Sequence, residues 1–357
     1  MKVYNIAVLE GDGIGPEVMK EALKLLDVIS KKNNIKFEYI KGLVGAAAID
    51  KEGHPFPNST KNICNDADAI LFGAIGDPKY DNNPKAKIRP EDGLLEMRKF
   101  LGLYANVRPV ITYDSLLDSS PLKKEIVSGT NFVVFRELTG GIYFGEKSIS
   151  EDRKSAYDTC SYNINEIERI SHLAFKEARK RKKELTLVDK ANVLETSRLW
   201  REVVQKISKD YPDINVSYLF VDNAAMKIIT NPKDFDVILT ENMFGDIITD
   251  EASVITGSLG MLPSASIGDK ISLFEPIHGS YPQAVGKGIA NPMAMILSLA
   301  MMLDLSFNLK KESEIILKSV EDALNENFVT IDIDGKNYYS TSEVGDWLSK
   351  RVSEYLG

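Results

Sequence analysis

The chain has 357 residues, of which 43% are apolar and 27% are charged, and its formal net charge is −8. This length and composition are typical of a globular protein with one large two-lobed unit or two domains. The negative charge argues against a nucleic-acid backbone or an anionic membrane as the main partner, because both need a positive protein surface. No apolar run approaches the roughly 20 residues of a membrane span and no signal-peptide pattern is present, so we expect a cytoplasmic protein.

The first elements alternate between strand and helix patterns. An apolar run at 3–9 predicts a strand, and the loop "GDGIGPEV" leads from it into a helix that begins at Pro16. Residues 68–76 predict a second buried strand, and 94–101 predict a second helix. The loop glycines are spaced GxGxG and lack the third glycine of the dinucleotide fingerprint GxGxxG, so the loop does not predict a Rossmann fold.

The middle of the chain contains shorter, more polar strand patterns. The segment "NFVVFRELTGGIYFG" (131–145) predicts antiparallel strands with a turn at Gly140 and Gly141. The segment "EDRKSAYDTCSYN" (151–163) is strand-like but too short to fold alone, so we expect it to pair with another chain. The basic run "ARKRKKE" (178–184) falls where a helix should end, and cations there complement the helix dipole, which is a simpler explanation than a localisation or RNA-binding signal.

From Leu185 onward the alternation is clearest. The strand patterns "LTLVD", "INVSYLF" and "FDVILT" are each followed by a helical pattern, which predicts parallel βαβ units. The last hundred residues are expected to be mostly helical, with 293–305 as a core or interface helix. Cys64 and Cys160 lie far apart without CxxC spacing, which favours buried thiols in a reducing compartment over a disulfide or zinc framework.

Three arginines, Arg98, Arg108 and Arg136, lie amid apolar residues at the edges of predicted elements. A solvated arginine would be ordinary there, but a buried one needs an anion. The guanidinium fork matches a carboxylate, so three such residues suggest a substrate with more than one carboxylate group.

Other charged residues have both an ordinary and a functional interpretation. Asp246 and Asp250 lie four residues apart, on one face of a predicted helix. Their charges are either solvated by water or neutralised by a cation such as Mg²⁺. Lys190 follows a predicted strand, at the strand end where α/β sheets bind ligands. It is either a surface charge or a base with a lowered pKa. The glycine- and proline-rich string 274–292 offers backbone N–H groups and His278 to a phosphate or an adenine, although His278 could also be a core histidine.

Together these strings resemble the family of β-decarboxylating dehydrogenases that act on isopropylmalate, isocitrate, homoisocitrate and tartrate. The resemblance covers nearly the whole chain, from "GDGIGPEV" through "GLLEMRKFLGLYANVRP", "RELTGGIYFG", "VDKANVLE", "VDNAAM" and "NMFGDIITDEAS" to "EPIHGS" and "GIANP". It implies an α/β fold of the isopropylmalate dehydrogenase type, with two domains and a mixed parallel and antiparallel sheet, not a Rossmann fold. One domain (1–103 and 257–357) would join both chain ends and bind the cofactor. The other (104–256) would hold substrate and metal residues, the dimer interface and an intersubunit arm at about 145–163.

The resemblance also implies roles for individual residues. Lys190 would be the general base for the C2 hydroxyl, and Tyr143 the acid that protonates the enol carbon after CO₂ leaves. Mg²⁺ or Mn²⁺ would stabilise the enolate. The substrate carboxylates would be bound by Arg98, Arg108 and Arg136, and the metal by Asp222, Asp246 and Asp250, of which Asp222 also contacts the substrate. The cofactor would be bound by Ile14, Glu275, His278, Gly279, Ser280, Gln283 and Asn291. In this family Lys190 and Asp222 come from the second subunit, which implies a homodimer with composite sites.

The expected substrate follows from an apolar pocket. Leu94, Leu95 and Val193, the last from the second subunit, match the family's pocket for an isopropyl group, and a third carboxylate would be left unpaired against them. The resemblance therefore favours NAD-dependent oxidative decarboxylation of isopropylmalate to 2-oxoisocaproate in leucine biosynthesis. Isocitrate, homoisocitrate or a tartrate-like acid is the alternative substrate. A non-catalytic regulatory subunit is a more remote alternative, since it would be expected to lose part of the lysine, tyrosine and aspartate set.

Two positions depart from the family pattern. Gln283 stands where NAD-using members usually have an aspartate that bonds the ribose hydroxyls. Glutamine can bond a hydroxyl but does not repel a 2′-phosphate, and neither Gln283 nor Ala284 is a cation that would favour one, so we expect NAD with weakened discrimination. Glu10 stands where proline is common, and the sequence does not indicate what this second departure changes.

Overall fold

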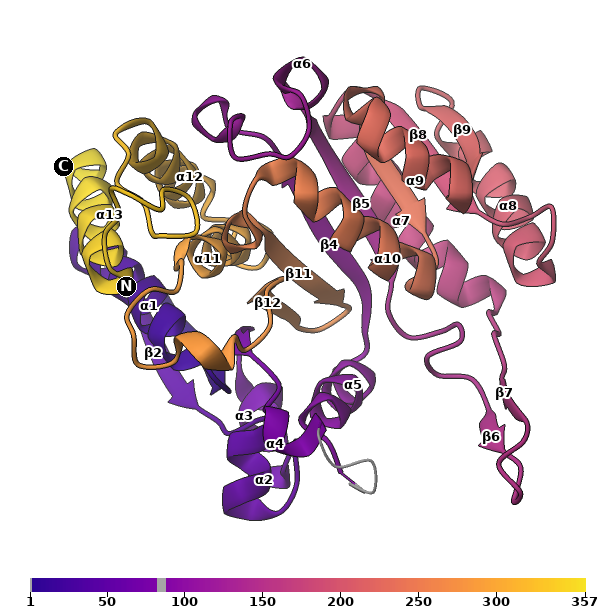
Figure 1. Cartoon of the computed structure of the whole chain (residues 1–357), viewed down its shortest axis with the longest axis horizontal. Coiled ribbons are helices and arrows are strands. Elements are labelled where there is room, and N and C mark those ends of the chain that lie inside the picture. Colours follow the sequence, from indigo (N-terminus) through magenta and orange to yellow (C-terminus); the bar gives the residue numbers. More distant parts are fainter. Residues whose placement is uncertain (1, 82–87) are drawn as a thin grey trace. The chain divides into compact units, whose positions relative to one another are not determined.

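The computed structural model describes residues 2–81 and 88–357, and the chain divides into two compact units. Unit 1 comprises Met1–Leu103 and Ser258–Gly357, and unit 2 comprises Tyr104–Gly257. Unit 1 thus contains both chain ends (Figure 1). The two predicted domains differ from these units at Gly257, which lies in unit 2. Cofactor binding by one domain and dimer contacts by the other remain predictions.

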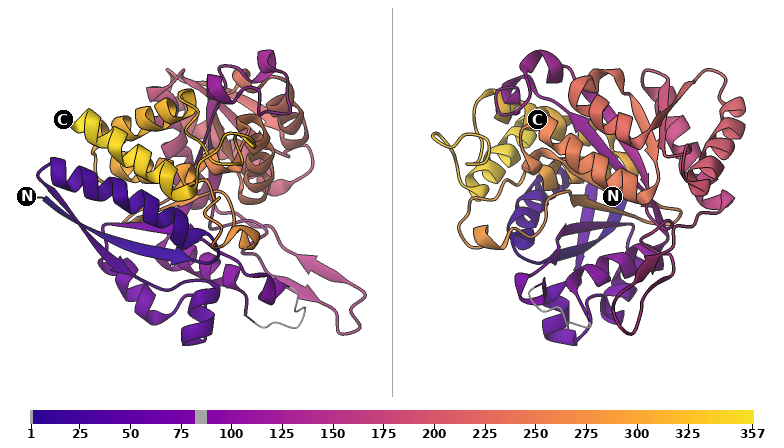
Figure 2. Two further views of the ribbon diagram at one scale, coloured as in Figure 1. Left: turned by 60° about the vertical axis from the view of Figure 1, so that its left-hand side comes forward. Right: turned by 45° about the vertical axis from the view of Figure 1, so that its right-hand side comes forward.

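Unit 1 has a mixed sheet between two layers of helices. Its strands are ordered β2-β1-β3-β12-β11; neighbours are parallel except β11, which is antiparallel to β12. Ile70 and Phe72 of β3 pack with Cys64 and Met97 of α3 and α5 in one core. Helices α1 and α13 run side by side (Figures 1 and 2), and α11 packs on β11 and β12. The elements of unit 1 are β1 (Lys2–Gly11), α1 (Gly15–Lys32), β2 (Ile35–Lys41), α2 (Ala46–Glu52), α3 (Asn58–Asp66), β3 (Ala69–Ala74), α4 (Pro78–Asp81), α5 (Pro90–Leu101), β11 (Pro263–Gly268), β12 (Ser272–Pro276), α11 (Met293–Leu305), α12 (Lys310–Asn325) and α13 (Thr341–Leu356).

Unit 2 contains the predicted parallel βαβ units. Its strands are ordered β4-β5-β10-β8-β9; β4 is antiparallel to β5, and the other neighbours are parallel. Ile228 of α9 and Ile248 of α10 share a core with Ile238 of β10, while α7 and α8 pack on each other and on the sheet. The elements of unit 2 are β4 (Leu103–Ile111), α6 (Lys124–Val127), β5 (Asn131–Glu137), β6 (Lys147–Ile149), β7 (Ala156–Asp158), α7 (Ile164–Lys180), β8 (Glu184–Asp189), α8 (Glu195–Ile207), β9 (Asn215–Phe220), α9 (Val221–Thr230), β10 (Val237–Thr240) and α10 (Asn242–Ser253).

The α/β class with a mixed sheet is confirmed, and the "GDGIGPEV" loop has a packing role in it. Gly11 and Gly13 have φ of +71° and +58°. A Cβ at Gly11 would lie 1.9 Å from the carbonyl oxygen of Ala74, and one at Gly13 would lie 2.0 Å from that of Ser280. Glycine is therefore required where this loop meets two other segments of unit 1. The Ile14 amide also donates to the Ser280 oxygen at 2.8 Å.

Three sequence predictions are wrong. The antiparallel partner of β5 is β4 and not residues after Gly141, because the Gly141 amide bonds the Ser161 oxygen at 3.0 Å and residues 141–145 form a turn. The last hundred residues are not mostly helical, because α11, α12 and α13 alternate with the irregular segments 277–292 and 326–340 and with the strand pair β11 and β12, which is buried against α11. Cys64 is buried, but Cys160 is only half-buried.

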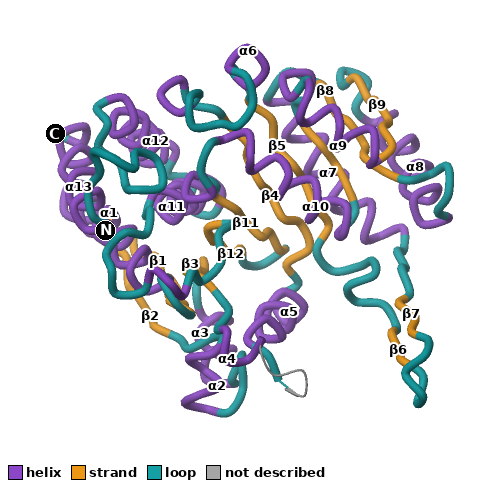
Figure 3. Tube along the Cα trace, in the orientation of Figure 1, coloured by secondary structure: helices purple, strands orange, loops and turns teal. Residues whose placement is uncertain are grey.

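The segment predicted to pair with another chain forms a hairpin in its own chain. Strand β7 pairs antiparallel with β6, and every residue of both strands is exposed. The hairpin extends away from the rest of unit 2 (Figures 1 and 3). In the described ranges, no helix has both the length and the apolar character needed to cross a membrane.

Candidate functional site

Two of the predicted arginines are buried inside unit 2. Arg108 on β4 and Arg136 on β5 have exposed fractions of 8% and 2%. Arg108 donates from Nε to Asn106 Oδ1 at 2.6 Å and from Nη1 to Thr249 Oγ1 at 2.6 Å. Arg136 donates from Nε to the carbonyl oxygen of Asn242 at 2.9 Å. Backbone and side-chain acceptors thus fix both guanidinium groups, which reduces the entropy lost when they bind an anion.

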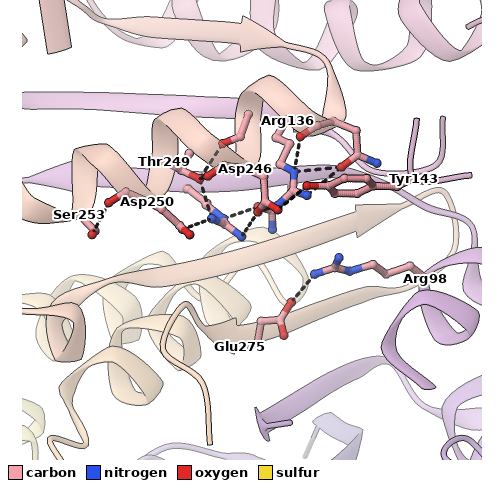
Figure 4. Close-up of polar contacts among 12 residues, drawn as sticks. Arg98, Arg136, Tyr143, Asp246, Thr249, Asp250, Ser253 and Glu275 are labelled. Atoms are coloured by element: carbon pink, nitrogen blue, oxygen red, sulfur yellow. Dashed lines mark hydrogen bonds and ion pairs between the residues drawn. The ribbon is translucent and has the colours of Figure 1, made fainter. Parts of the chain in front are cut away.

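The carboxylates opposite these arginines come from one face of α10. Asp246 pairs with Arg136 Nη1, and Asp250 Oδ1 lies 3.5 Å from Arg108 Nη1 (Figure 4). Asp246 lies one helical turn before Asp250, as their spacing predicted. The two arginines offset the repulsion between the carboxylates, so the pair is not simply a solvated acidic face.

Tyr143 joins this group from the turn after β5. Its hydroxyl donates to Asp246 Oδ2 at 2.9 Å, and its ring centre lies 5.8 Å from Arg136 Cζ (Figure 4). Burial and the negative charge of Asp246 raise the pKa of Tyr143 above its usual value. The phenol therefore holds its proton at neutral pH, as a proton donor must.

Lys190 and Asp222 form a separate pair on unit 2. Lys190 directly follows β8, and its Nζ donates to Asp222 Oδ1 at 2.6 Å. This hydrogen bond lowers the pKa of Asp222. The Asp222 side chain is 64% exposed, and Val193, whose amide bonds the Lys190 oxygen, is also exposed. The structure therefore brings Lys190, Val193 and Asp222 together, and it forms no hydrogen bond among the described residues between this pair and Asp246, Asp250 or Tyr143.

Arg98 belongs to unit 1, and its described partner is also an acid. It lies on α5, and its Nη2 is 3.4 Å from Glu275 Oε1 on β12 (Figure 4). Its buried Nε has no hydrogen-bond partner in the described part of the chain, which leaves a donor for an anion. On the same helix, Leu94 packs partly into the core of unit 1, and Leu95 is half-buried.

The predicted cofactor string lies in unit 1 after β12. His278 Nδ1 is 3.0 Å from the Gly279 oxygen, and its shielded Nε2 has no partner among the described residues. Burial lowers the pKa of His278, so the ring is neutral and its Nε2 is free for a ligand. Gln283 is exposed, Ser280 and Asn291 are buried, and Ile14 is buried with only its backbone bonded to Ser280. These features fit a nucleotide, with Ile14 the least accessible of the predicted contacts.

A divalent cation also has suitable ligands, but not three in one group. Asp246 and Asp250 offer hard carboxylate oxygens one helical turn apart, the ligands that Mg²⁺ prefers. Across residues 2–81 and 88–357, no three His, Cys, Asp or Glu side chains gather closely enough to bind a metal. Asp222, the third predicted ligand, pairs with Lys190 instead.

Some residues around these groups were not predicted from the sequence. Asn242 accepts from Arg136 and donates to the Gly140 oxygen at 3.2 Å. Asp332 accepts from Asn291 Nδ2 at 3.1 Å and from Ser258. Glu241 is buried at the start of α10, and burial raises its pKa to about 7. Asn242 and Glu241 could have been indicated by their position directly before the "MFGD" string. The sequence contains no such signal for Asp332.

The fold and these groups define a dehydrogenase of the isocitrate/isopropylmalate type, and the chain belongs to this family. The family described as "Isocitrate/isopropylmalate dehydrogenase" matches residues 5–348. A protein of Aquifex aeolicus named 3-isopropylmalate dehydrogenase is 54% identical over 357 residues, which cover 99% of this chain and 98% of that protein. One of the same name from Bacteroides fragilis strain YCH46 is 53% identical over 347 residues, covering 97% and 98%. The crystal structure of isocitrate dehydrogenase from Methylococcus capsulatus superimposes with a TM-score of 0.88 at 32% identity, covering 98% of this chain and 99% of that one.

Proposed function

We propose that the protein is an NAD-dependent 3-isopropylmalate dehydrogenase. It would oxidise C2 of (2R,3S)-3-isopropylmalate and release CO₂ to give 4-methyl-2-oxopentanoate, a step of leucine biosynthesis in the cytoplasm. The observation that carries this proposal is the meeting of Arg136, Tyr143 and Asp246, because one carboxylate already accepts from both the guanidinium and the phenol. The names of the relatives support the choice of substrate.

Each charged group has a proposed task. Arg108 and Arg136, joined by Arg98 of unit 1, would bind and orient the substrate carboxylates. Lys190 would accept the proton of the C2 hydroxyl, and Tyr143 would donate one to C3 after CO₂ has left. Asp246 and Asp250, with Asp222, would hold Mg²⁺ or Mn²⁺. When bound, this cation would supply Lewis-acid stabilisation of negative charge, and NAD would be the two-electron oxidant.

The separation of the charged groups supports a homodimer. Lys190, whose side chain is half-buried, pairs with the exposed Asp222, and Tyr143 and the two other carboxylates lie in another group of unit 2. We propose that Lys190, Val193 and Asp222 of a second copy complete the site, and that the hairpin β6–β7 contributes to the contact between copies. Composite sites follow from closed two-fold symmetry when a group of one subunit faces the other subunit's site.

The specificity test compares four acids. Purified protein with Mg²⁺ and NAD should turn over isopropylmalate faster than isocitrate, homoisocitrate or tartrate, because Leu94 and Leu95 offer no partner to the third carboxylate of the first two acids or to the second hydroxyl of tartrate. Faster turnover of isocitrate would contradict the proposed substrate. We also expect a higher kcat/KM with NAD than with NADP, and the reverse order would contradict the proposed cofactor.

A further inference from the structure

The turn that carries Tyr143 is held by the returning end of the arm segment 145–163. Residues 141–145 form one turn in which the Gly145 amide bonds the Gly141 oxygen at 3.1 Å. The Gly141 amide bonds the Ser161 oxygen at 3.0 Å, and a Cβ at Gly145 would lie 1.7 Å from the Thr159 oxygen. The position of Tyr143 therefore depends on residues almost twenty positions later in the chain.

Tyr162 packs directly against this turn. A Cβ at Gly140 would lie 2.7 Å from Cε1 of Tyr162, and one at Gly141 would lie 2.3 Å from its hydroxyl. On its other side the Tyr162 ring meets Trp200, edge to face, at 5.4 Å between ring centres. The ring thus lies between Trp200 and the two glycines, and it has little room to move.

The hydroxyl of Tyr162 also fixes the start of α10, which carries Asp246 and Asp250. It accepts from the Asn242 amide at 3.0 Å. That amide is at the first position of α10, where an N–H has no acceptor inside the helix, and Glu241 provides no side-chain cap. The Asn242 side chain in turn donates to the Gly140 oxygen at 3.2 Å and accepts from Arg136. Tyr162, Asn242 and Gly140 therefore form a closed set of contacts.

We propose that Tyr162 is a positioning residue that holds the Tyr143 turn and the first turn of α10 in a fixed relation. This inference rests on the proposed function only for its effect on turnover. Its hydroxyl accepts from α10 and lies against Gly141 of the turn, its ring lies against Gly140, and neither has a described contact with the proposed reacting groups. The packing of residues 159–162 against the turn is therefore coupled to the alignment of Tyr143 with Asp246.

The test substitutes Tyr162→Phe, with Tyr211→Phe as the matched control. Tyr211 is a buried tyrosine of unit 2 whose hydroxyl is 3.0 Å from His172 Nδ1, away from the site. Each change removes one hydrogen-bonding hydroxyl, so both should lower the melting temperature to a similar extent. Only Tyr162→Phe should lower kcat on isopropylmalate, by about tenfold, with the KM for NAD unchanged within about twofold. Equal kcat values for the two variants would overturn the proposal.

A second readout needs no substrate. Amide hydrogen exchange in segments 138–146 and 241–247 should rise in Tyr162→Phe and stay at the wild-type rate in Tyr211→Phe. Gly140→Ala, whose added Cβ would press on the Tyr162 ring from the side of the turn, should raise exchange in the same two segments. Wild-type exchange in both segments of Tyr162→Phe would overturn the coupling. Absence of turnover by the wild-type protein would instead contradict the proposed function and leave the exchange result to decide the coupling.

Discussion

Two charged groups of unit 2 differ in how firmly they are held. Arg108 and Arg136 are buried and bonded to several acceptors on β4, α10 and their neighbours. Lys190 has one described ion pair, to the exposed carboxylate of Asp222. Contacts within one chain hold both arginines in place. The Lys190 side chain is held mainly by its one ion pair. Burial therefore fixes the proposed substrate-binding arginines, whereas the pair of Lys190 and the exposed Asp222 stays accessible to another surface.

The largest effect is expected from a substitution of Lys190. Lys190→Ala should lower kcat by about 10²- to 10⁴-fold, because it removes the proposed general base. Its free energy of unfolding should change little, since an ion pair to an exposed carboxylate contributes little. Steady-state kinetics and urea unfolding measure the two effects. Lys124→Ala, which removes an exposed lysine paired with Asp118, is the control and should retain full turnover. Unchanged turnover in Lys190→Ala would refute the assignment of the base.

The buried group should respond in both activity and stability. Arg136→Gln removes the closer of the two ion pairs of Asp246, which is 35% exposed, and leaves only Arg108 Nη2 at 3.9 Å. We therefore expect a loss of about 2–3 kcal/mol in unfolding free energy, less than for a fully buried pair, together with loss of turnover. Arg179→Gln, at the more exposed pair with Asp213, should lower the unfolding free energy clearly less than Arg136→Gln does. Equal stability losses in the two variants would mean that burial does not distinguish the groups.

The buried carboxyl group of Glu241, at the start of α10, lowers the stability of the fold when it is ionised. Burial raises its pKa from 4.5 to about 7, and its Oε2 has no hydrogen-bond partner among the described residues. Because the folded protein holds this proton more tightly than the unfolded chain, Glu241 destabilises the fold as pH rises from about 4.5 to 7. Glu241→Gln should therefore gain about 3 kcal/mol relative to wild type between pH 4 and pH 8. Parallel unfolding curves for the two proteins at both pH values would contradict this account.

The smallest effect is expected at the exposed end of the cofactor string. Gln283→Asp places a negative charge where a 2′-phosphate would lie, so kcat/KM with NADP should fall about tenfold, while the value with NAD changes less than twofold. Gln283→Asn shortens the side chain in the same way without the charge, and it should not lower the NADP value selectively. Equal changes with both cofactors would show that Gln283 does not contact the ribose.

Local patterns were sufficient for the elements whose sequence periodicity matches their burial. Strands β8, β9 and β10 and the helices between them were predicted because apolar strands alternate with amphipathic helices there. The turn at 141–145 was not, because its conformation depends on contacts with Ser161 and Tyr162. Strands β11 and β12 are short and contain proline, so their pattern is weak, and burial against α11 stabilises them.

The candidate site was predicted unevenly for the same reason. The spacing of Asp246 and Asp250 on one helix is a local property, and the structure agrees with it. The contacts of Asn242 with Arg136, and of Asp332 with Asn291, join residues that are 106 and 41 positions apart in the chain. No periodicity indicates such contacts. These contacts depend on the order of the strands within each unit.

The central claim is that Lys190 of one copy serves the buried arginines and the Tyr143 of a second copy. Lys190→Ala and Tyr143→Phe should each be inactive alone. In a hybrid dimer of the two, isolated by co-expression with two different tags, one site would combine intact Tyr143 with intact Lys190, and the other would lack both. We predict that the hybrid recovers about half of the wild-type activity per dimer. A hybrid as inactive as its parents would show that Lys190 and Tyr143 act within the same chain, contrary to this account.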